Sequence, residues 1–157
     1  MENLIKLLDT NLKLNTYQIS DDTIYLYVES IKQGIKCPEC GFISNRVHSH
    51  YERSFQDLPI QGKKSIVILS NRKMFCDNPE CSRTTFAESF SFLGHKSKKT
   101  HRLEDEILNV SHNMSSVAAQ RLLRKSVAAV SKSTICLLLK KRNSHVTGKI
   151  KCTRNGK

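Results

Sequence analysis

The stretch Cys37-Pro38-Glu39-Cys40 places two cysteines close together, and the stretch from Cys76 to Cys81 repeats this arrangement with four residues between the cysteines. Thirty-five residues separate the two pairs. Two short knuckles, each offering two thiolates and joined by strands, are what a tetrahedral zinc site requires. A closed shell of four cysteines leaves no position for a substrate water. The sequence therefore predicts one structural zinc ion, held by Cys37, Cys40, Cys76 and Cys81.

Two other uses of these cysteines are possible. They could be buried free thiols, but Pro38 and Gly41 beside the first pair and Asn78-Pro79 within the second indicate tight turns. The first pair could be a redox motif, but it lacks the strand and helix context of a thioredoxin-like site. Metal binding is therefore the prediction.

The remaining candidate ligands are expected to play other roles. His48 and His50 follow the first pair and could replace a cysteine, but four cysteines already fill the zinc shell, so we expect surface or strand-face histidines. Cys136 is expected to be a small packing residue, and Cys152 an exposed thiol.

Composition narrows the class of protein. The chain has 157 residues, of which 38% are hydrophobic, enough for one domain or two small ones. It contains no apolar run of about 18 residues, so no transmembrane helix is expected. The segment Met1–Lys6 has an early acid and does not resemble a secretory signal. Zinc in a reducing cytoplasm is therefore favoured over disulfides.

Charge is distributed unevenly along the chain. Residues 1–95 contain 11 Lys/Arg and 11 Asp/Glu, whereas residues 96–157 contain 15 Lys/Arg and 3 Asp/Glu. This predicts two functional units, the second of which binds a polyanion, most simply duplex DNA. The alternative is a solvated basic tail that only increases solubility.

The first part, residues 1–95, has the pattern of a zinc-ribbon domain with its core at about 35–88. Thr23 to Glu29 alternates, with Ile24, Leu26 and Val28 on one face, and predicts a half-buried strand. The other expected elements are a short helix over Glu2 to Leu8, a turn at Asp21-Asp22, a strand within Arg46 to Leu58, a hairpin connection over Pro59 to Lys64, and a strand over Ser65 to Phe75.

From Thr100 onward the pattern becomes helical. The apolar positions predict three short helices, with stripes at Leu103, Ile107, Leu108 and Val110, at Val117, Ala118, Leu122 and Leu123, and at Ile135, Leu138 and Leu139. Thr100, Ser115 or Ser116, and Ser131 are plausible caps. A short break at 126–130 suggests a helix-turn-helix over residues 96–142, followed by a basic tail or linker over 143–157. The fold class is thus α+β, although a helical bundle that does not bind DNA stays open.

The predicted DNA contacts lie on and before these helices. With the apolar stripe of the third helix inward, its outward residues would face the major groove, and cations at its ends would reach phosphates. The residues are Ser133, Cys136, Leu137 and Lys140 for the groove, Lys132, Lys141 and Arg142 for phosphates, and Lys96, Lys98, Lys99 and Arg102 for the backbone or a minor groove.

Nothing in the chain has a catalytic pattern. Metal-assisted strand transfer needs clustered carboxylates, but the acids are scattered over residues 2–106, and Asp57 and Glu88 have no patterned partner. We therefore expect that the chain is not an enzyme by itself.

The sequence resembles the N-terminal portion of bacterial insertion-sequence transposases of the ISL-three family. The matching stretches are Cys37-Pro38-Glu39-Cys40-Gly41, Val47-His48-Ser49-His50-Tyr51-Glu52-Arg53, Asp57-Leu58-Pro59, Gly62, Arg72-Lys73-Met74-Phe75-Cys76, Cys81-Ser82-Arg83, Phe86-Ala87-Glu88, Thr100-His101-Arg102-Leu103 and Val130-Ser131-Lys132-Ser133-Thr134-Ile135. The resemblance implies a zinc ribbon, then a helix-turn-helix that binds terminal inverted repeats, and a bacterial cytoplasmic protein at the nucleoid.

In that family an RNase H-like catalytic domain with an Asp-Asp-Glu triad follows. This sequence has no acid beyond Glu106 and ends at Lys157, so it resembles a truncated transposase or a stand-alone relic, and the triad corresponds to no position here. Two rival functions remain. One is the DNA-binding half of a split or frameshifted transposase. The other is an interaction module that forms a homodimer or inhibits full-length transposase through the outward Leu137.

Overall fold

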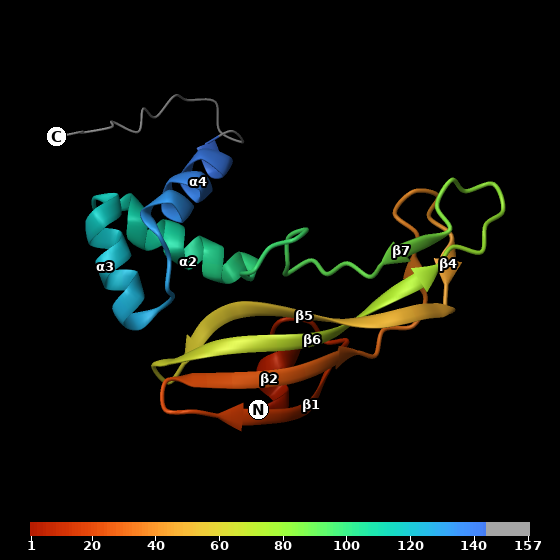
Figure 1. Ribbon diagram of the computed structural model, residues 1–157, viewed down its shortest axis with the longest axis horizontal. Helices are drawn as coiled ribbons and strands as arrows, with labels where there is room; N and C mark the ends of the chain where they lie inside the picture. Colours follow the sequence, from red (N-terminus) through yellow and green to blue (C-terminus); the bar gives the residue numbers. More distant parts are fainter. Residues whose placement is uncertain (144–157) are drawn as a thin grey trace. The chain divides into compact units, whose positions relative to one another are not determined.

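The computed structural model describes residues 1–143 of the chain (Figure 1). The chain divides into two compact units, Met1–Thr100 and His101–Lys157. The predicted division at 95/96 lies five residues earlier. From residue 144 onward the predicted tail, and Cys152 with it, lies outside the described residues.

Within residues 1–100 the main element is a five-stranded sheet with the order β1-β2-β6-β5, in which β7 also pairs with β6. β2 and β6 run parallel, and the other pairs are antiparallel. β3 and β4 form a separate small ribbon. The elements are α1 (Glu2–Lys6), β1 (Leu12–Ile19), β2 (Thr23–Ser30), β3 (Ile35–Lys36), β4 (Ile43–Ser44), β5 (Val47–Ile60), β6 (Lys63–Phe75) and β7 (Thr85–Ala87).

The core lies on one face of this sheet. Ile24, Leu26 and Val28 are buried on β2, as their alternation predicts, and Val67 and Leu69 are buried opposite them on β6. Tyr25 and Tyr27 lie on the other face and are half-buried. The predicted strands therefore form with the expected inward side.

The connection between β5 and β6 is the predicted hairpin turn. Its two residues, Gln61 and Gly62, have φ angles of 49° and 77°. Positive φ at both positions is the signature of a type I′ turn, which matches the twist of the flanking strands. Pro59 lies in β5 where the register shifts between Asp57 and Ile60, a place where its missing N–H breaks no ladder bond.

Two N-terminal features differ from the prediction. β1 was not predicted, because its register shifts between Leu14 and Thr16 and the alternation of its side chains changes phase there. The helix ends at Lys6 rather than Leu8, and Leu7 is 71% exposed. Ile5 is the residue of α1 that enters the core, because a helix this short can place few side chains against the sheet.

Residues 97–100 are attached to β5, which explains why the first unit ends at Thr100. The amide of Gln56 donates to Lys98 O (2.8 Å), and the amide of Thr100 donates to Gln56 O (3.0 Å). The Thr100 hydroxyl, which is fully buried, donates to Oδ1 of the buried Asp57 at 2.7 Å. The role of Thr100 as the cap of the following helix stays a prediction.

Replacing Thr100 by valine is expected to destabilise the first unit by about 1.5–3 kcal/mol, since the substitution removes a hydrogen bond to a buried carboxylate. Urea unfolding of the zinc-loaded chain measures this change. Thr16→Val, at an exposed position of β1, is the matched control and should change stability by less than about 0.5 kcal/mol. Equal effects of the two substitutions would contradict the anchoring role of Thr100.

Residues 101–143 form three helices, α2 (His101–His112), α3 (Ser116–Ser126) and α4 (Lys132–Asn143). Ser115 caps α3 by accepting from the amide of Ala118 (3.3 Å), and Ser131 caps α4 by accepting from the amide of Thr134 (3.2 Å). Both caps agree with the sequence analysis. The core residues of this unit are Leu103, Ile107, Leu108, Ala119, Leu123, Ala128, Val130 and Ile135.

The buried face of α3 is rotated from the predicted one. Val117 and Leu122 are 44% and 45% exposed, and Ala118 is also exposed, whereas Ala119 and Leu123 are fully buried. Adjacent residues project about 100° apart on a helix, so Ala118 and Ala119, or Leu122 and Leu123, cannot both face the core. The small side chain of Ala119 permits a close approach of α3 to the neighbouring helices. Among the described helices, none is long and apolar enough to cross a membrane.

Candidate metal centre

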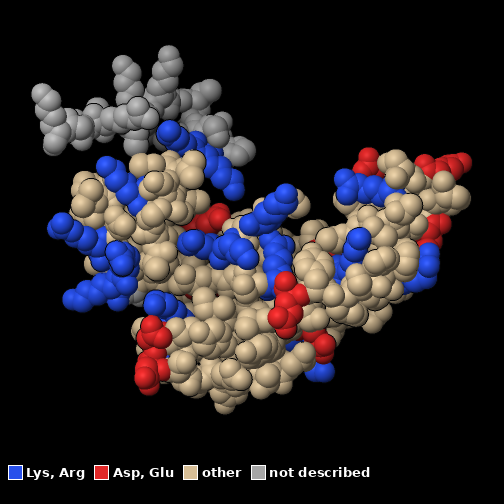
Figure 2. Space-filling view, in the orientation of Figure 1, with Lys and Arg blue, Asp and Glu red and all other residues tan. Residues whose placement is uncertain are grey.

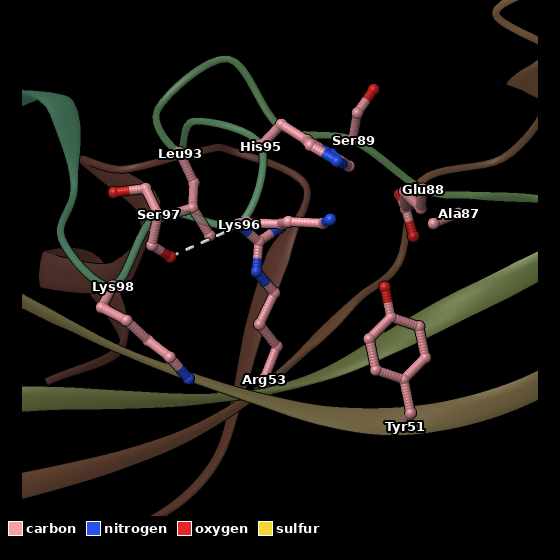
Figure 3. A pocket seen from close by; sticks show the side chains of 10 residues that line it. All are labelled: Tyr51, Arg53, Ala87, Glu88, Ser89, Leu93, His95, Lys96, Ser97 and Lys98. Atoms are coloured by element: carbon pink, nitrogen blue, oxygen red, sulfur yellow. Dashed lines mark hydrogen bonds between the residues drawn. The ribbon is translucent and has the colours of Figure 1, made fainter.

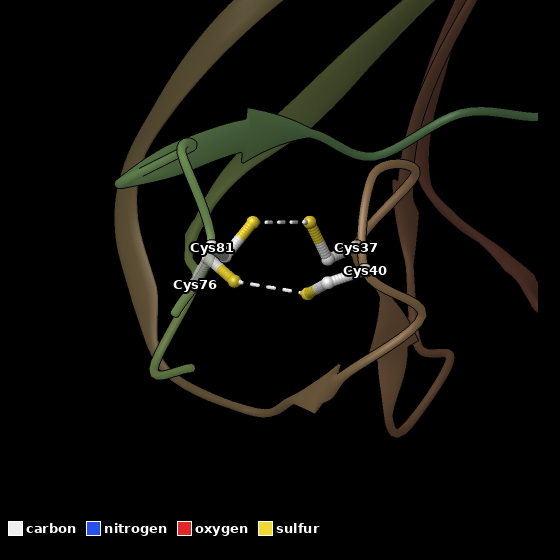
Figure 4. A group of neighbouring side chains, drawn as sticks. All are labelled: Cys37, Cys40, Cys76 and Cys81. Atoms are coloured by element: carbon white, nitrogen blue, oxygen red, sulfur yellow. Dashed lines mark hydrogen bonds between the residues drawn. The ribbon is translucent and has the colours of Figure 1, made fainter. Parts of the chain in front are cut away.

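The four predicted ligands converge in the first unit (Figure 4). The Sγ atoms all lie within 4.8 Å of one another. Cys37 Sγ is 3.9 Å from Cys81 Sγ, and Cys40 Sγ is 3.6 Å from Cys76 Sγ. A tetrahedral shell with Zn–S bonds of about 2.3 Å requires sulfur–sulfur distances of about 3.8 Å. The four thiols therefore fit a zinc ion.

The first knuckle lies between β3 and β4. The amide of Cys37 donates to Phe42 O (2.8 Å), and the amide of Gly41 donates to Cys37 O (2.9 Å). Gly41 has a φ of 73°, a left-handed conformation that costs glycine nothing. This turn brings Cys40 back beside Cys37.

The second knuckle lies between β6 and β7. The side chain of Asn78 accepts from the amide of Glu80 (3.0 Å), and the amide of Cys81 donates to Asn78 O (3.1 Å). Pro79 therefore stands at the second position of a β-turn, where its fixed φ is favourable. The pairing of β6 with β7 closes the loop, and the amide of Cys76 donates to Thr84 O (2.9 Å).

Little hydrophobic surface supports these knuckles. The buried residues around them are Ile35, Cys37, Met74 and Phe86, with the half-buried Cys76 and Cys81 packed against the cluster. Such a cluster is too small to hold two loops by burial alone, so the metal takes the place of a larger core.

The thiols titrate very differently before a metal binds. A backbone hydrogen bond from Phe42 lowers the pKa of Cys40 to about 6. For Cys76 a backbone hydrogen bond from Asn78 lowers the pKa, but desolvation and hydrogen bonds to the neighbouring thiols outweigh it and raise the pKa to about 12. Four thiolates therefore do not coexist without a cation, and zinc binding must displace protons.

The two histidines after the first knuckle lie away from the metal shell. In the part of the chain that the structure describes, the four cysteines are the group of three or more ligating side chains close enough to share a metal. His48 and His50 are exposed on β5, and the His48 ring packs against Phe75 with the ring centroids 4.8 Å apart. Both are strand-face histidines, as predicted.

Two ion pairs that the sequence analysis missed join the knuckles. Arg83 Nε lies 2.6 Å from Glu39 Oε2, and Arg46 Nε lies 2.9 Å from Asp77 Oδ1. The Arg46 guanidinium also lies 4.1 Å from the centroid of the Phe75 ring. The sequence signal that could have predicted these ion pairs is the presence of oppositely charged residues beside the two cysteine pairs. Because these pairs are exposed, each contributes at most about 1 kcal/mol.

The predicted DNA contacts fall into two groups. Lys96, Lys98 and Lys99 belong to the sheet unit, and of these Lys99 is half-buried. The others lie on the helices. Arg102 is half-buried on α2, Cys136 is half-buried on α4, and the exposed residues of α4 are Lys132, Ser133, Leu137, Lys140, Lys141 and Arg142. Cys136 thus faces outward less than expected. The role of all these residues in DNA binding stays a prediction.

The comparison with known proteins agrees with the geometry. The family described as the zinc-finger of transposase IS204/IS1001/IS1096/IS1165 matches residues 33–84, a range that includes all four cysteines. No curated protein and no solved structure matches the chain. Residues 33–84 are therefore a transposase-derived zinc-ribbon region, and its four cysteines hold one structural zinc ion.

Proposed function

We propose that this chain binds DNA and recognises the terminal inverted repeats of an insertion element. In this proposal the zinc ion orders the first unit, α3 and α4 act as a helix-turn-helix, and α4 enters the major groove. The observation that carries the proposal is the exposed basic surface of α4 in a chain that also contains a transposase-type zinc ribbon.

The charge of the helical unit supports this proposal. Residues 101–143 contain eight Lys/Arg and three acids, and the acids are Glu104, Asp105 and Glu106 of α2. α3 and α4 contain no acid. On the face drawn in Figure 2, most of the charged side chains of this unit are lysine and arginine. Each phosphate neutralised by such a cation releases counterions, which favours binding at low salt.

The packing of the last two helices also supports it. Residues 127–131 connect α3 to α4, and Ala128 and Val130 of this connection are buried together with Leu123 and Ile135. A short connection with two buried side chains fixes one helix against the next, which a recognition helix requires. Leu137 is 66% exposed, so α4 presents an apolar side chain within its polar surface, suited to a thymine methyl group.

Fluorescence anisotropy across a salt titration tests the proposal. The zinc-loaded chain would be titrated into a labelled duplex carrying the terminal repeat of an element of the matched type, and into a scrambled duplex. We expect binding to the repeat to be tighter by about 10³-fold or more. Equal and steeply salt-dependent binding to both duplexes would leave only a nonspecific cationic surface.

Replacing Lys140 by alanine is expected to weaken binding to the repeat by about 1–3 kcal/mol and to reduce discrimination against the scrambled duplex, because we place this side chain at base edges. Zinc content should not change. Lys6→Ala removes another exposed lysine, on α1, and should leave binding unchanged. A Lys140→Ala protein that binds both duplexes like the unmodified chain would argue against α4 as the recognition helix.

We also propose that this chain supplies recognition and not strand cleavage. Its acids are scattered along the sequence rather than clustered for two-metal chemistry. Nicking of a labelled terminal-repeat duplex by the purified zinc-loaded chain in Mg²⁺ or Mn²⁺ would contradict this statement.

A second candidate function is pairing with full-length transposase or with another copy of the chain. The exposed apolar residues of the helical unit favour it: Met114, Val117, Leu122 and Leu137 are all at least 36% exposed. Such a surface suits a protein partner. A complex with full-length transposase that resists high salt and is lost in Leu137→Glu would support this alternative.

A further inference from the structure

The first unit contains a pocket away from the zinc site. Its volume is about 480 Å³, and it lies between β5 and residues 87–98. Its cationic lining comes from Arg53, Lys96 and Lys98, while His95 adds an imidazole ring and Tyr51 a hydroxyl group. Figure 3 shows His95 and Lys96 extending from their loop toward Tyr51, with Arg53 rising from β5 beneath them.

Hydrogen bonds hold the loop that carries these cations. Arg53 Nη2 donates to Gly94 O (2.7 Å) and to Ser97 O (3.5 Å). The amide of Ser97 donates to Gly94 O (3.0 Å), and the amide of Gln56 donates to Lys98 O (2.8 Å). Leu93, which is 4% exposed, anchors the start of the loop in the core. The cations are therefore presented from a fixed backbone, which reduces the entropy lost on binding.

The positive charge of this pocket is not neutralised within the described residues. Glu88 lines the pocket, but its carboxylate is engaged by Arg72 (2.8 Å) and by the Ser30 hydroxyl (2.7 Å). Across residues 1–143, no acid lies within ion-pair distance of Lys96 or Lys98. The pocket therefore has an excess of positive charge, which favours an anion.

The backbone conformation of Lys96 also favours a bound anion. Its φ is 57°, a left-handed conformation that glycine adopts more easily and that costs a lysine roughly 1 kcal/mol. A lysine at a position that favours glycine is therefore a local cost. It is accounted for if the ammonium group binds a ligand.

We propose that this pocket holds one backbone phosphate of a DNA duplex, with Lys96, Lys98 and Arg53 as its partners. The inference rests on the proposed DNA-binding function and assigns a phosphate contact to the zinc-ribbon unit, separate from α4. A phosphate accepts several hydrogen bonds at once, and the lysines, the guanidinium and the Tyr51 hydroxyl can donate them.

The test uses Lys96→Gly, which removes the cation and also relieves the strained φ, so the variant should fold. Two controls match it. Gln61→Gly relieves a positive φ of 49° at the β5–β6 turn, and Lys13→Ala removes an exposed lysine from β1 at the other edge of the sheet. The slope of log Kobs against log salt is measured for each protein on the terminal-repeat duplex. Lys96→Gly should reduce the magnitude of this negative slope by about 0.9 and lower the affinity at 0.1 M salt by about fivefold to tenfold. Both controls should match the unmodified chain.

The outcomes separate the pocket from the proposed function. A Lys96→Gly slope equal to that of the unmodified chain, with tight duplex binding in both, overturns the phosphate contact and leaves DNA binding intact. If the unmodified chain binds no duplex, the proposed function fails and the DNA phosphate fails with it. A titration with inorganic phosphate, monitored by the amide chemical shifts of residues 94–98, then tests whether the pocket binds a free phosphate. Shifts that disappear in Lys96→Gly would indicate a site for a free phosphate instead, and their absence would reject the pocket as an anion site.

Discussion

Replacing Cys37 by serine is expected to abolish stable zinc binding and to unfold the zinc-ribbon region. Cys37 is both a ligand and 2% exposed in the small cluster beneath the knuckles. Structural zinc contributes roughly 10–16 kcal/mol in isolated zinc-finger peptides, more than burial of a few side chains can replace. Zinc should fall from one ion per chain to near zero in the presence of a competing chelator, as measured by elemental analysis.

Unfolding in the Cys37→Ser protein should be confined to the zinc-ribbon region. Amide resonances of the two knuckles, residues 35–44 and 76–84, should collapse toward random-coil positions, whereas those of α2, α3 and α4 should persist, because the helical unit has its own core. Cys136→Ser, at a half-buried cysteine of α4, is the matched control and should retain one zinc ion. A Cys37→Ser protein that keeps its zinc and a dispersed spectrum would refute the assignment of Cys37 as a ligand.

Replacing Glu88 by alanine is expected to destabilise the first unit by about 3 kcal/mol, because it leaves a half-buried guanidinium without its counter-charge. The Glu88 side chain is 1% exposed and that of Arg72 is 14% exposed. The carboxylate accepts from Arg72 Nε (2.8 Å), Arg72 Nη2 (3.1 Å) and the Ser30 hydroxyl (2.7 Å). These contacts join the end of β2 to β6 and to the residue that follows β7.

Glu29→Ala is the matched control, since it deletes the same side chain from an exposed pair. Glu29 lies 3.3 Å from Lys13, and its side chain is 40% exposed. Its loss should cost less than about 1 kcal/mol. Urea unfolding of both variants, each loaded with zinc, measures the difference. Similar midpoints for the two variants would mean that the pair of Arg72 and Glu88 adds nothing beyond a surface contact.

How far the sequence predicts the structure depends on whether the signal is local. The β2 strand was predicted because Ile24, Leu26 and Val28 alternate without interruption, whereas β1 was missed because its register shifts after Leu14. The caps Ser115 and Ser131 were predicted because an N-cap needs only its own next turn. The buried face of α3 was predicted only in part. Leu123 is buried as expected, but Leu122 is equally apolar in the sequence, and contacts between helices decide which of the two is buried.

The identity of the zinc ligands follows from the sequence alone. Ligand type and spacing are properties of the chain, and turns at Gly41 and Asn78-Pro79 bring each cysteine pair together locally. Tertiary packing sets the pairing of β2 with β6, the anchoring of Thr100 by Asp57, and the pocket that joins Arg53 to Lys96. These features depend on residues 40 or more positions apart, whose approach is fixed by the packing of the sheet and leaves no periodic trace in the sequence.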